Sequence, residues 1–159
     1  GGNRHAPDAL AGRRAVKEQT TRLGILVTHP IQYFAPLFRE LAADPGVDLT
    51  VLYRTRKGVD SYHDPGFGRS LKWDVPLLED YPHVFLSNRA DVAGVEWQVL
   101  RHVMHRRFDA LVIHGYTSLT NLLAIVACKL LGHRMMVAPG TVDIKETAFE
   151  KLRSIDHVS

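Results

Sequence analysis

The sequence has very little cysteine and no long hydrophobic run. Cys128 is the one cysteine among 159 residues, which excludes a disulfide framework and fits a reducing compartment best. No apolar stretch approaches the roughly 20 residues that a membrane-spanning helix needs, and the N-terminus lacks the apolar segment of a signal peptide. These absences exclude a disulfide-rich secreted domain and an integral membrane protein.

Strong net charge is also lacking, because 20 Lys and Arg face 17 Asp and Glu and leave a formal charge of +3. This excess is too small to indicate nucleic-acid binding, and we expect no nucleic-acid partner. Two short basic clusters stand at 54–57 (RTRK) and 106–108 (RRF). Each cluster either lies on a solvated face or attracts an anionic partner. Such a partner would be a phosphorylated ligand or an anionic membrane surface.

Several catalytic and metal-binding signatures are absent. No G-x-G-x-x-G follows the first apolar run, which weakens a dinucleotide-binding interpretation, and no G-x-S-x-G is present. His102 and His105 have the i, i+3 spacing that could chelate a metal on a helix. They lack an acidic or thiol partner at suitable spacing, so we expect a surface helix and no metal site.

The hydrophobic residues are sufficient for one domain with a real core, since they make up 45% of the chain. Residues 1–21 are polar and lack sustained periodicity, and we expect a flexible leader there, with a short helix at 7–16 as the alternative. Gly1 and Gly2 resemble a cloning remnant, which suggests a piece of a longer polypeptide. Residues 22–159 form the predicted domain.

From Leu23 onward, short apolar runs alternate with segments of helical periodicity. The pattern predicts strands at 23–28, 47–54, 71–76, 83–88, 109–115 and 133–140. It predicts helices at 36–44, 92–108, 117–132 and 144–155, the first beginning either at Pro36 or near Pro30, and the third N-capped by Thr117 or Ser118 and ended by Gly132. Residues 57–70 are expected to form a long irregular loop. The alternation indicates an α/β fold with a mainly parallel, Rossmann-like sheet and helices on both faces.

Polar residues gather where these strands end. In an open α/β sheet, ligands bind outside the carboxyl ends of the strands. The segments that leave those ends are 28–30 (THP), 54–58 (RTRKG), 114–118 (HGYTS) and 139–141 (PGT). We therefore predict a binding site for a polar small molecule at this edge.

Individual residues at that edge have more than one interpretation. Three interpretations of His29 stay open: a general base, a donor to a phosphate, or a residue at the start of a helix that satisfies backbone groups. His114 lies between a buried strand and Gly115, where backbone can approach a ligand closely. Tyr33 and Phe34 more often pack than bind.

Four segments together resemble a known family: ILVTHPIQYFAPLFRELA, LTVLYR, GFGRSLKWDVPLLEDYPHVFLSN and FDALVIHGYTS. They are similar to the N-terminal half of family-4-type glycosyltransferases of the GT-B architecture, over roughly residues 23–159. In that family two Rossmann-like domains face each other across a cleft. The N-terminal domain mainly holds the acceptor, and the C-terminal domain binds the nucleotide-sugar through paired glutamates and a glycine-rich turn.

The resemblance implies roles for particular residues. His114 matches a histidine that orients the transferred sugar through its backbone carbonyl or its ring, which makes it the expected catalytic residue. The expected substrate-binding residues are Thr28, His29, Tyr33, Arg54, Gly115, Tyr116 and Thr117. Members usually transfer the sugar with retention and without a metal, so catalysis would consist of positioning and electrostatics.

The resemblance also sets limits. The stretch APGTVD at 138–143 lacks the arginine that relatives often carry there, and the chain ends at Ser159, before any second domain. We expect this half to be inactive alone, to need no cofactor besides the nucleotide-sugar donor, and to bind a glycan or small-molecule acceptor. The alternative is a non-catalytic binding or scaffold module of the same fold. The expected location is cytoplasmic, with a weak attachment to the inner membrane face through Arg54, Arg56 and Lys57 as a further hypothesis.

Overall fold

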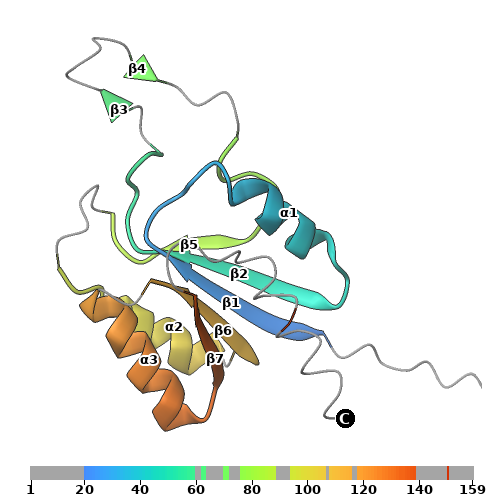
Figure 1. Ribbon diagram of the computed structural model, residues 1–159, viewed down its shortest axis with the longest axis vertical. Helices are drawn as coiled ribbons and strands as arrows, with labels where there is room; N and C mark the ends of the chain where they lie inside the picture. Colours follow the sequence, from blue (N-terminus) through green and yellow to red (C-terminus); the bar gives the residue numbers. More distant parts are fainter. Residues whose placement is uncertain are drawn as a thin grey trace, which may run out of the picture.

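Five parallel strands form the central sheet of the chain. The computed structural model describes residues 20–59, 62–63, 70–71, 76–88, 94–106, 108–115, 118–138 and 150. Strands β1 (Thr21–Val27), β2 (Val47–Tyr53), β5 (His83–Phe85), β6 (Ala110–His114) and β7 (Arg134–Ala138) pair in the order β5-β2-β1-β6-β7, all parallel (Figure 1). The predicted Rossmann-like α/β fold is therefore confirmed.

The central strands are buried on both faces, as their continuous apolar runs predict. In β1, Leu23, Ile25 and Leu26 are fully buried, and β2 and β6 show the same pattern. A parallel sheet needs helices on both faces to exclude water in this way. In the described part of the chain, Ala35–Ala43 (α1) covers one face, and Gln98–Arg106 (α2) and Leu119–Leu131 (α3) cover the other (Figure 1).

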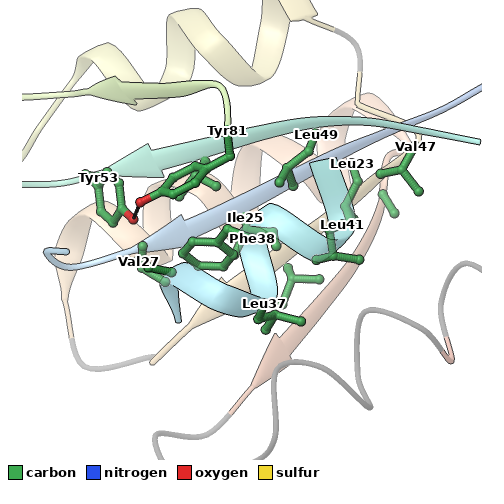
Figure 2. Packing of buried hydrophobic residues seen from close by; sticks show 14 residues of the cluster. Leu23, Ile25, Val27, Leu37, Phe38, Leu41, Val47, Leu49, Tyr53 and Tyr81 are labelled. Atoms are coloured by element: carbon green, nitrogen blue, oxygen red, sulfur yellow. Dashed lines mark hydrogen bonds between the residues drawn. The ribbon is translucent and has the colours of Figure 1, made fainter. Parts of the chain in front are cut away.

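Helix α1 (Ala35–Ala43) covers the first face of the sheet. It begins with Pro36 in its first turn, where a missing N–H costs no helical hydrogen bond. Phe38 and Leu41 pack against Ile25 and neighbouring residues of β1 and β2 (Figure 2). At the edge of this core, the hydroxyls of Tyr53 and Tyr81 are 2.8 Å apart, and the Tyr81 hydroxyl donates to the Leu77 carbonyl.

Helices α2 (Gln98–Arg106) and α3 (Leu119–Leu131) cover the second face. Gly24 of β1 leaves space for two core side chains on this face, because a Cβ at that position would lie 2.6 Å from Leu111 Cδ1 and 3.1 Å from the Phe108 ring. The side chains of β1 alternate, so that Leu23, Ile25 and Val27 pack in the core under α1 and Leu26 packs in the core under α2 and α3.

Helix α3 has the caps that its sequence predicts. The Ser118 hydroxyl accepts a hydrogen bond from the Asn121 N–H at 3.1 Å, which decides between the two candidate N-caps. Gly132 ends the helix in the left-handed conformation, with φ +70°, a conformation that other residues rarely adopt.

Three predicted elements differ from the structure. The helix expected from residue 92 begins only at Gln98, so that Val95 lies before it and Phe108 packs into the core from beyond its end. The segment expected to form a loop at 57–70 takes part in a short antiparallel pair of strands, β3 (Tyr62–His63) and β4 (Ser70–Leu71). The pair has only two residues on each side. Of the strand expected at 71–76, Leu71 belongs to β4, and residues 72–75 lie outside the described residues.

Other predictions fall largely outside the described residues. The leader helix at 7–16 lies there entirely, as do residues 139–143 of the APGTVD stretch and all of the helix expected at 144–155 except Glu150. Among the residues that the structure describes, no helix has both the length and the hydropathy needed to cross a membrane.

Candidate functional site

The carboxyl ends of the parallel strands meet at one edge of the sheet, which we call the rim. The rim consists of the described residues that follow β1, β2 and β6, together with the first turn of α3: residues 28–34, 54–58, 114–115 and 118–121. Since β1 lies between β2 and β6, the segment that begins with Thr28 and His29 is central in the rim. Predicted site residues from three different strands are therefore brought together.

His29 lies partly buried at the centre of the rim. Burial lowers the pKa of its imidazole below the usual 6.5, and the nearby Lys57 and His114 lower it further. The ring is therefore mostly neutral at pH 7. Its Nδ1 is buried and has no hydrogen-bond partner among the described residues. A neutral imidazole of this kind can donate one hydrogen bond and accept another.

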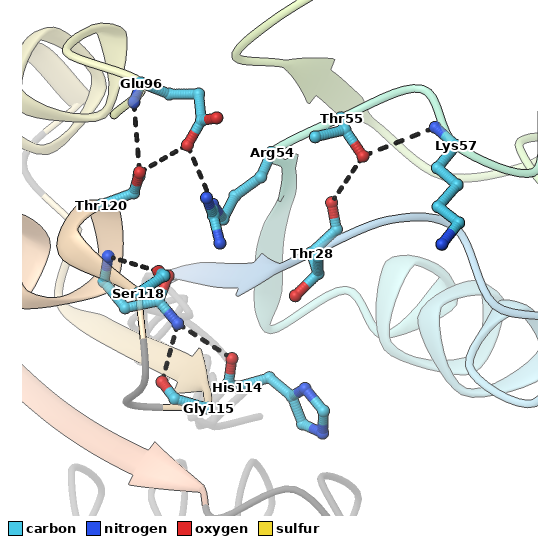
Figure 3. A network of polar contacts seen from close by, with 10 residues as sticks. Thr28, Arg54, Thr55, Lys57, Glu96, His114, Gly115, Ser118 and Thr120 are labelled. Atoms are coloured by element: carbon cyan, nitrogen blue, oxygen red, sulfur yellow. Dashed lines mark hydrogen bonds and ion pairs between the residues drawn. The ribbon is translucent and has the colours of Figure 1, made fainter. Parts of the chain in front are cut away.

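His114 is the last residue of β6 and is oriented from two sides. Its ring meets the ring of Phe34 edge-on, with the centroids 5.5 Å apart. Its backbone carbonyl accepts a hydrogen bond from Asn121 Nδ2 at 3.1 Å. Figure 3 shows the ring directed away from that carbonyl. The carbonyl is engaged within the protein, which leaves the ring as the part of His114 with polar atoms for a ligand.

Asn121 holds the turn that follows β6. Its Nδ2 donates to the Gly115 carbonyl at 2.7 Å as well as to His114, and the side chain is 3% exposed. Gly115 has φ +84°, so the turn suits glycine and no other residue easily. The sequence reasoning missed Asn121. Its signal was a polar residue on the buried face of an apolar helix.

The segment after β2 is tied to the segment after β1. The Thr28 carbonyl accepts hydrogen bonds from the Thr55 N–H at 3.0 Å and the Thr55 hydroxyl at 3.4 Å. Gly58 has φ +87°, and a Cβ there would lie 3.6 Å from the Pro30 carbonyl oxygen. This close approach brings the exposed residue Lys57 to the side of His29. Thr28 contributes its backbone to this contact.

Arg54 has a structural partner that the sequence did not indicate. Its Nε lies 2.9 Å from Glu96 Oε2, and the two residues are 4% and 8% exposed (Figure 3). The Thr120 hydroxyl donates to the same carboxylate and accepts from the Glu96 N–H at 3.1 Å. The expectation that Arg54 faces a membrane surface is therefore wrong, because a buried, ion-paired guanidinium cannot reach one. Its role in substrate binding stays a prediction.

Tyr33 and Phe34 are adjacent in the sequence but have different surroundings. Tyr33 is 78% exposed, whereas its neighbour Phe34 packs against the core cluster under α1. Tyr33 thus presents an aromatic ring to solvent beside the rim, and Phe34 supports His114. Tyr116 and Thr117 lie outside the described residues.

The rim combines Arg54, Arg56, Lys57, two imidazoles and several backbone groups, and its residues include no carboxylate. Glu96 lies outside the rim and pairs with Arg54 in the interior. No group of three His, Cys, Asp or Glu suited to a metal ion occurs in the described part of the chain. The arrangement suits the recognition of a polar ligand with hydroxyl or anionic groups, since its donors outnumber its charged acceptors.

No protein-family model matches the chain, and no curated protein is significantly similar to it. The structure by itself places the chain among the Rossmann-like parallel α/β folds.

Proposed function

We propose that the chain is the acceptor-binding half of a glycosyltransferase that moves a sugar from a nucleotide-sugar to a glycan or small-molecule acceptor, with retention. One observation carries the proposal. Two partly buried histidines from neighbouring strands, His29 and His114, meet at the carboxyl edge of a Rossmann-like sheet beside Lys57. Such an edge is where open α/β folds bind their ligands.

The groups at the rim suit sugar hydroxyls. An imidazole that is mostly neutral at pH 7 donates one hydrogen bond and accepts another, which matches the donor and acceptor of a sugar hydroxyl. Because the ring is neutral, binding does not require a charged group to lose its water. His114 would act through its ring, because Asn121 occupies its carbonyl. His29 would contact the acceptor, and Lys57 would favour negative charge nearby.

Catalysis in this proposal is positioning. Glu96, the carboxylate that reaches the rim residues Arg54 and Thr120, is paired with Arg54 and is not placed to act as a base. The His114 ring, held by Phe34, would orient a sugar hydroxyl while the phosphate of the donor assists deprotonation of the acceptor. The donor itself would bind mainly to a second domain.

A binding measurement tests the acceptor role. We expect methyl glycosides of glucose, galactose, mannose and N-acetylglucosamine, added in turn to the ¹⁵N-labelled chain, to shift the imidazole resonances of His29 and His114 for at least one sugar. His105, exposed near the end of α2, is the matched control and should not shift. If none of the glycosides moves either rim histidine, the acceptor role is contradicted.

The alternative is a non-catalytic binding module of the same fold. Such a module would bind a glycoside equally well, so binding alone does not separate the two. Turnover by the longer polypeptide does, because a module without catalysis would release no nucleoside diphosphate from a nucleotide-sugar.

A further inference from the structure

Large apolar side chains are exposed on the side of the molecule that α2 and α3 cover. On α3 they recur at spacings of three and four residues, opposite the buried residues Ala124 and Cys128. The exposed stripe consists of Leu119 (63%), Leu122 (47%), Val126 (53%) and Leu130 (82%). A helix of a monomeric domain ordinarily places polar residues at these positions.

Helix α2 and the segment before it extend this stripe. Trp97 is 66% exposed and Met104 is 56% exposed. The hydrogen bond from the Glu96 N–H to the Thr120 hydroxyl brings Trp97 to the beginning of α3, and α2 and α3 share one core cluster. Together these six side chains form what we call the apolar face: Trp97, Met104, Leu119, Leu122, Val126 and Leu130.

The exposed charged side chains on the two segments that carry the apolar face have one sign. Within the described residues 94–106 and 118–138, the exposed charged side chains are basic: Arg101, Arg106, Lys129 and Arg134. The single acidic residue of those ranges, Glu96, is buried against Arg54. A second copy of the chain would bring these like charges together, which opposes self-association through this face. An anionic surface would be attracted to it.

We propose that the apolar face docks the chain onto an anionic lipid surface. A helix with an exposed leucine stripe and basic neighbours lies in the plane of a membrane interface, and tryptophan is enriched at that depth. The 13 residues of α3 span about 20 Å, which is shorter than the hydrocarbon core, so the helix lies on the membrane. The residues of the apolar face are not those of the basic cluster at 54–57. The docking proposal does not depend on the proposed acceptor role.

Vesicle co-sedimentation tests the docking. We expect the chain to bind vesicles of phosphatidylcholine mixed with phosphatidylglycerol, and to bind phosphatidylcholine alone about tenfold more weakly. High salt should weaken binding to the mixed vesicles. The double variant Leu122→Gln/Leu130→Gln should lose at least about tenfold in binding, because two exposed leucines no longer enter the interface. Both side chains are exposed, so the fold is preserved, which thermal unfolding checks.

The control variant is Tyr33→Gln, which removes a highly exposed aromatic ring beside the rim, away from the apolar face. It should bind the mixed vesicles as the parent does. The docking proposal is overturned if the chain fails to bind mixed vesicles, if both vesicle types bind equally, or if the double variant binds like the parent. It is also overturned if the parent is a dimer that the double variant dissociates.

Discussion

The side-chain amide of Asn121 lies 3.1 Å from the carbonyl oxygen of His114, and it joins the first turn of α3 to the end of β6. The same amide holds Gly115, so a single buried side chain fixes the turn that aims the His114 ring. The geometry of the candidate site thus depends on a residue that has no place in the proposed chemistry.

Replacing Asn121 with alanine should destabilise the chain. The substitution leaves two carbonyls without their donor in a part of the structure where Asn121 is 3% exposed. We expect the free energy of unfolding to fall by about 2 kcal/mol, measured by urea denaturation. Asn88→Ala, at an exposed position, is the control and should change it by less than about 0.5 kcal/mol. Equal effects of the two substitutions would contradict the role assigned to Asn121.

The Glu96→Gln substitution should cost more stability than a substitution in a surface ion pair. It removes the counter-charge of Arg54 while the guanidinium stays buried, and we expect a loss of about 3 kcal/mol. The surface pair of Arg22 and Asp109 is the comparison, since Asp109→Asn leaves Arg22 in contact with water. Urea denaturation of the two variants checks this order. A smaller loss for Glu96→Gln would show that the buried pair is not held as described.

Stability should depend on pH through His29. Its pKa is lower in the folded chain than the usual 6.5, chiefly because of burial, so the unfolded chain binds the proton more readily. The free energy of unfolding should therefore fall as the pH drops below about 6.5, and should level off once the folded-state pKa is passed.

Replacing His29 with glutamine should remove part of that dependence. His102, whose pKa is also lowered, mainly by burial, supplies a further part. Asn88→Gln, at an exposed position and without a titratable group, is the control and should leave the curve unchanged. The measurement is the urea midpoint between pH 7 and pH 5. An unchanged slope in His29→Gln would mean that the His29 ring is not buried as the structure shows.

Gly24→Ala should strain the second layer of the core. The new methyl group would lie 2.6 Å from Leu111 Cδ1, and both Leu111 and Phe108 are buried in the core. Overpacking of this kind costs about 1 to 3 kcal/mol. Thermal unfolding measures the loss. A variant as stable as the parent would show that Leu111 and Phe108 do not pack against Gly24 as closely as the structure shows.

Much of the fold follows from local patterns. The runs at β1, β2 and β6 are apolar along their whole length, which indicates burial on both faces, and Ser118 and Gly132 mark the ends of α3. The beginning of α2 could not be predicted, because Val95 continues the helical spacing although the chain is not yet helical there.

The candidate site was predictable only in part. The ends of the strands locate His29 and His114, since parallel strands bring their carboxyl ends to one edge. The pair of Arg54 and Glu96 joins positions 42 residues apart, and no local pattern relates them. A basic residue in a short cluster thus looked like a surface group, and only the three-dimensional structure shows its buried partner.

Turnover by the full-length protein tests the central proposal most directly. The release of nucleoside diphosphate from UDP-glucose, UDP-N-acetylglucosamine and GDP-mannose is measured for the parent, for His114→Ala and for the control His105→Ala. We predict acceptor-dependent release by the parent and the control from at least one donor, and a loss of about 100-fold in His114→Ala with the fold intact. Release that is unchanged in His114→Ala, or absent from the parent with every donor, would contradict the proposal.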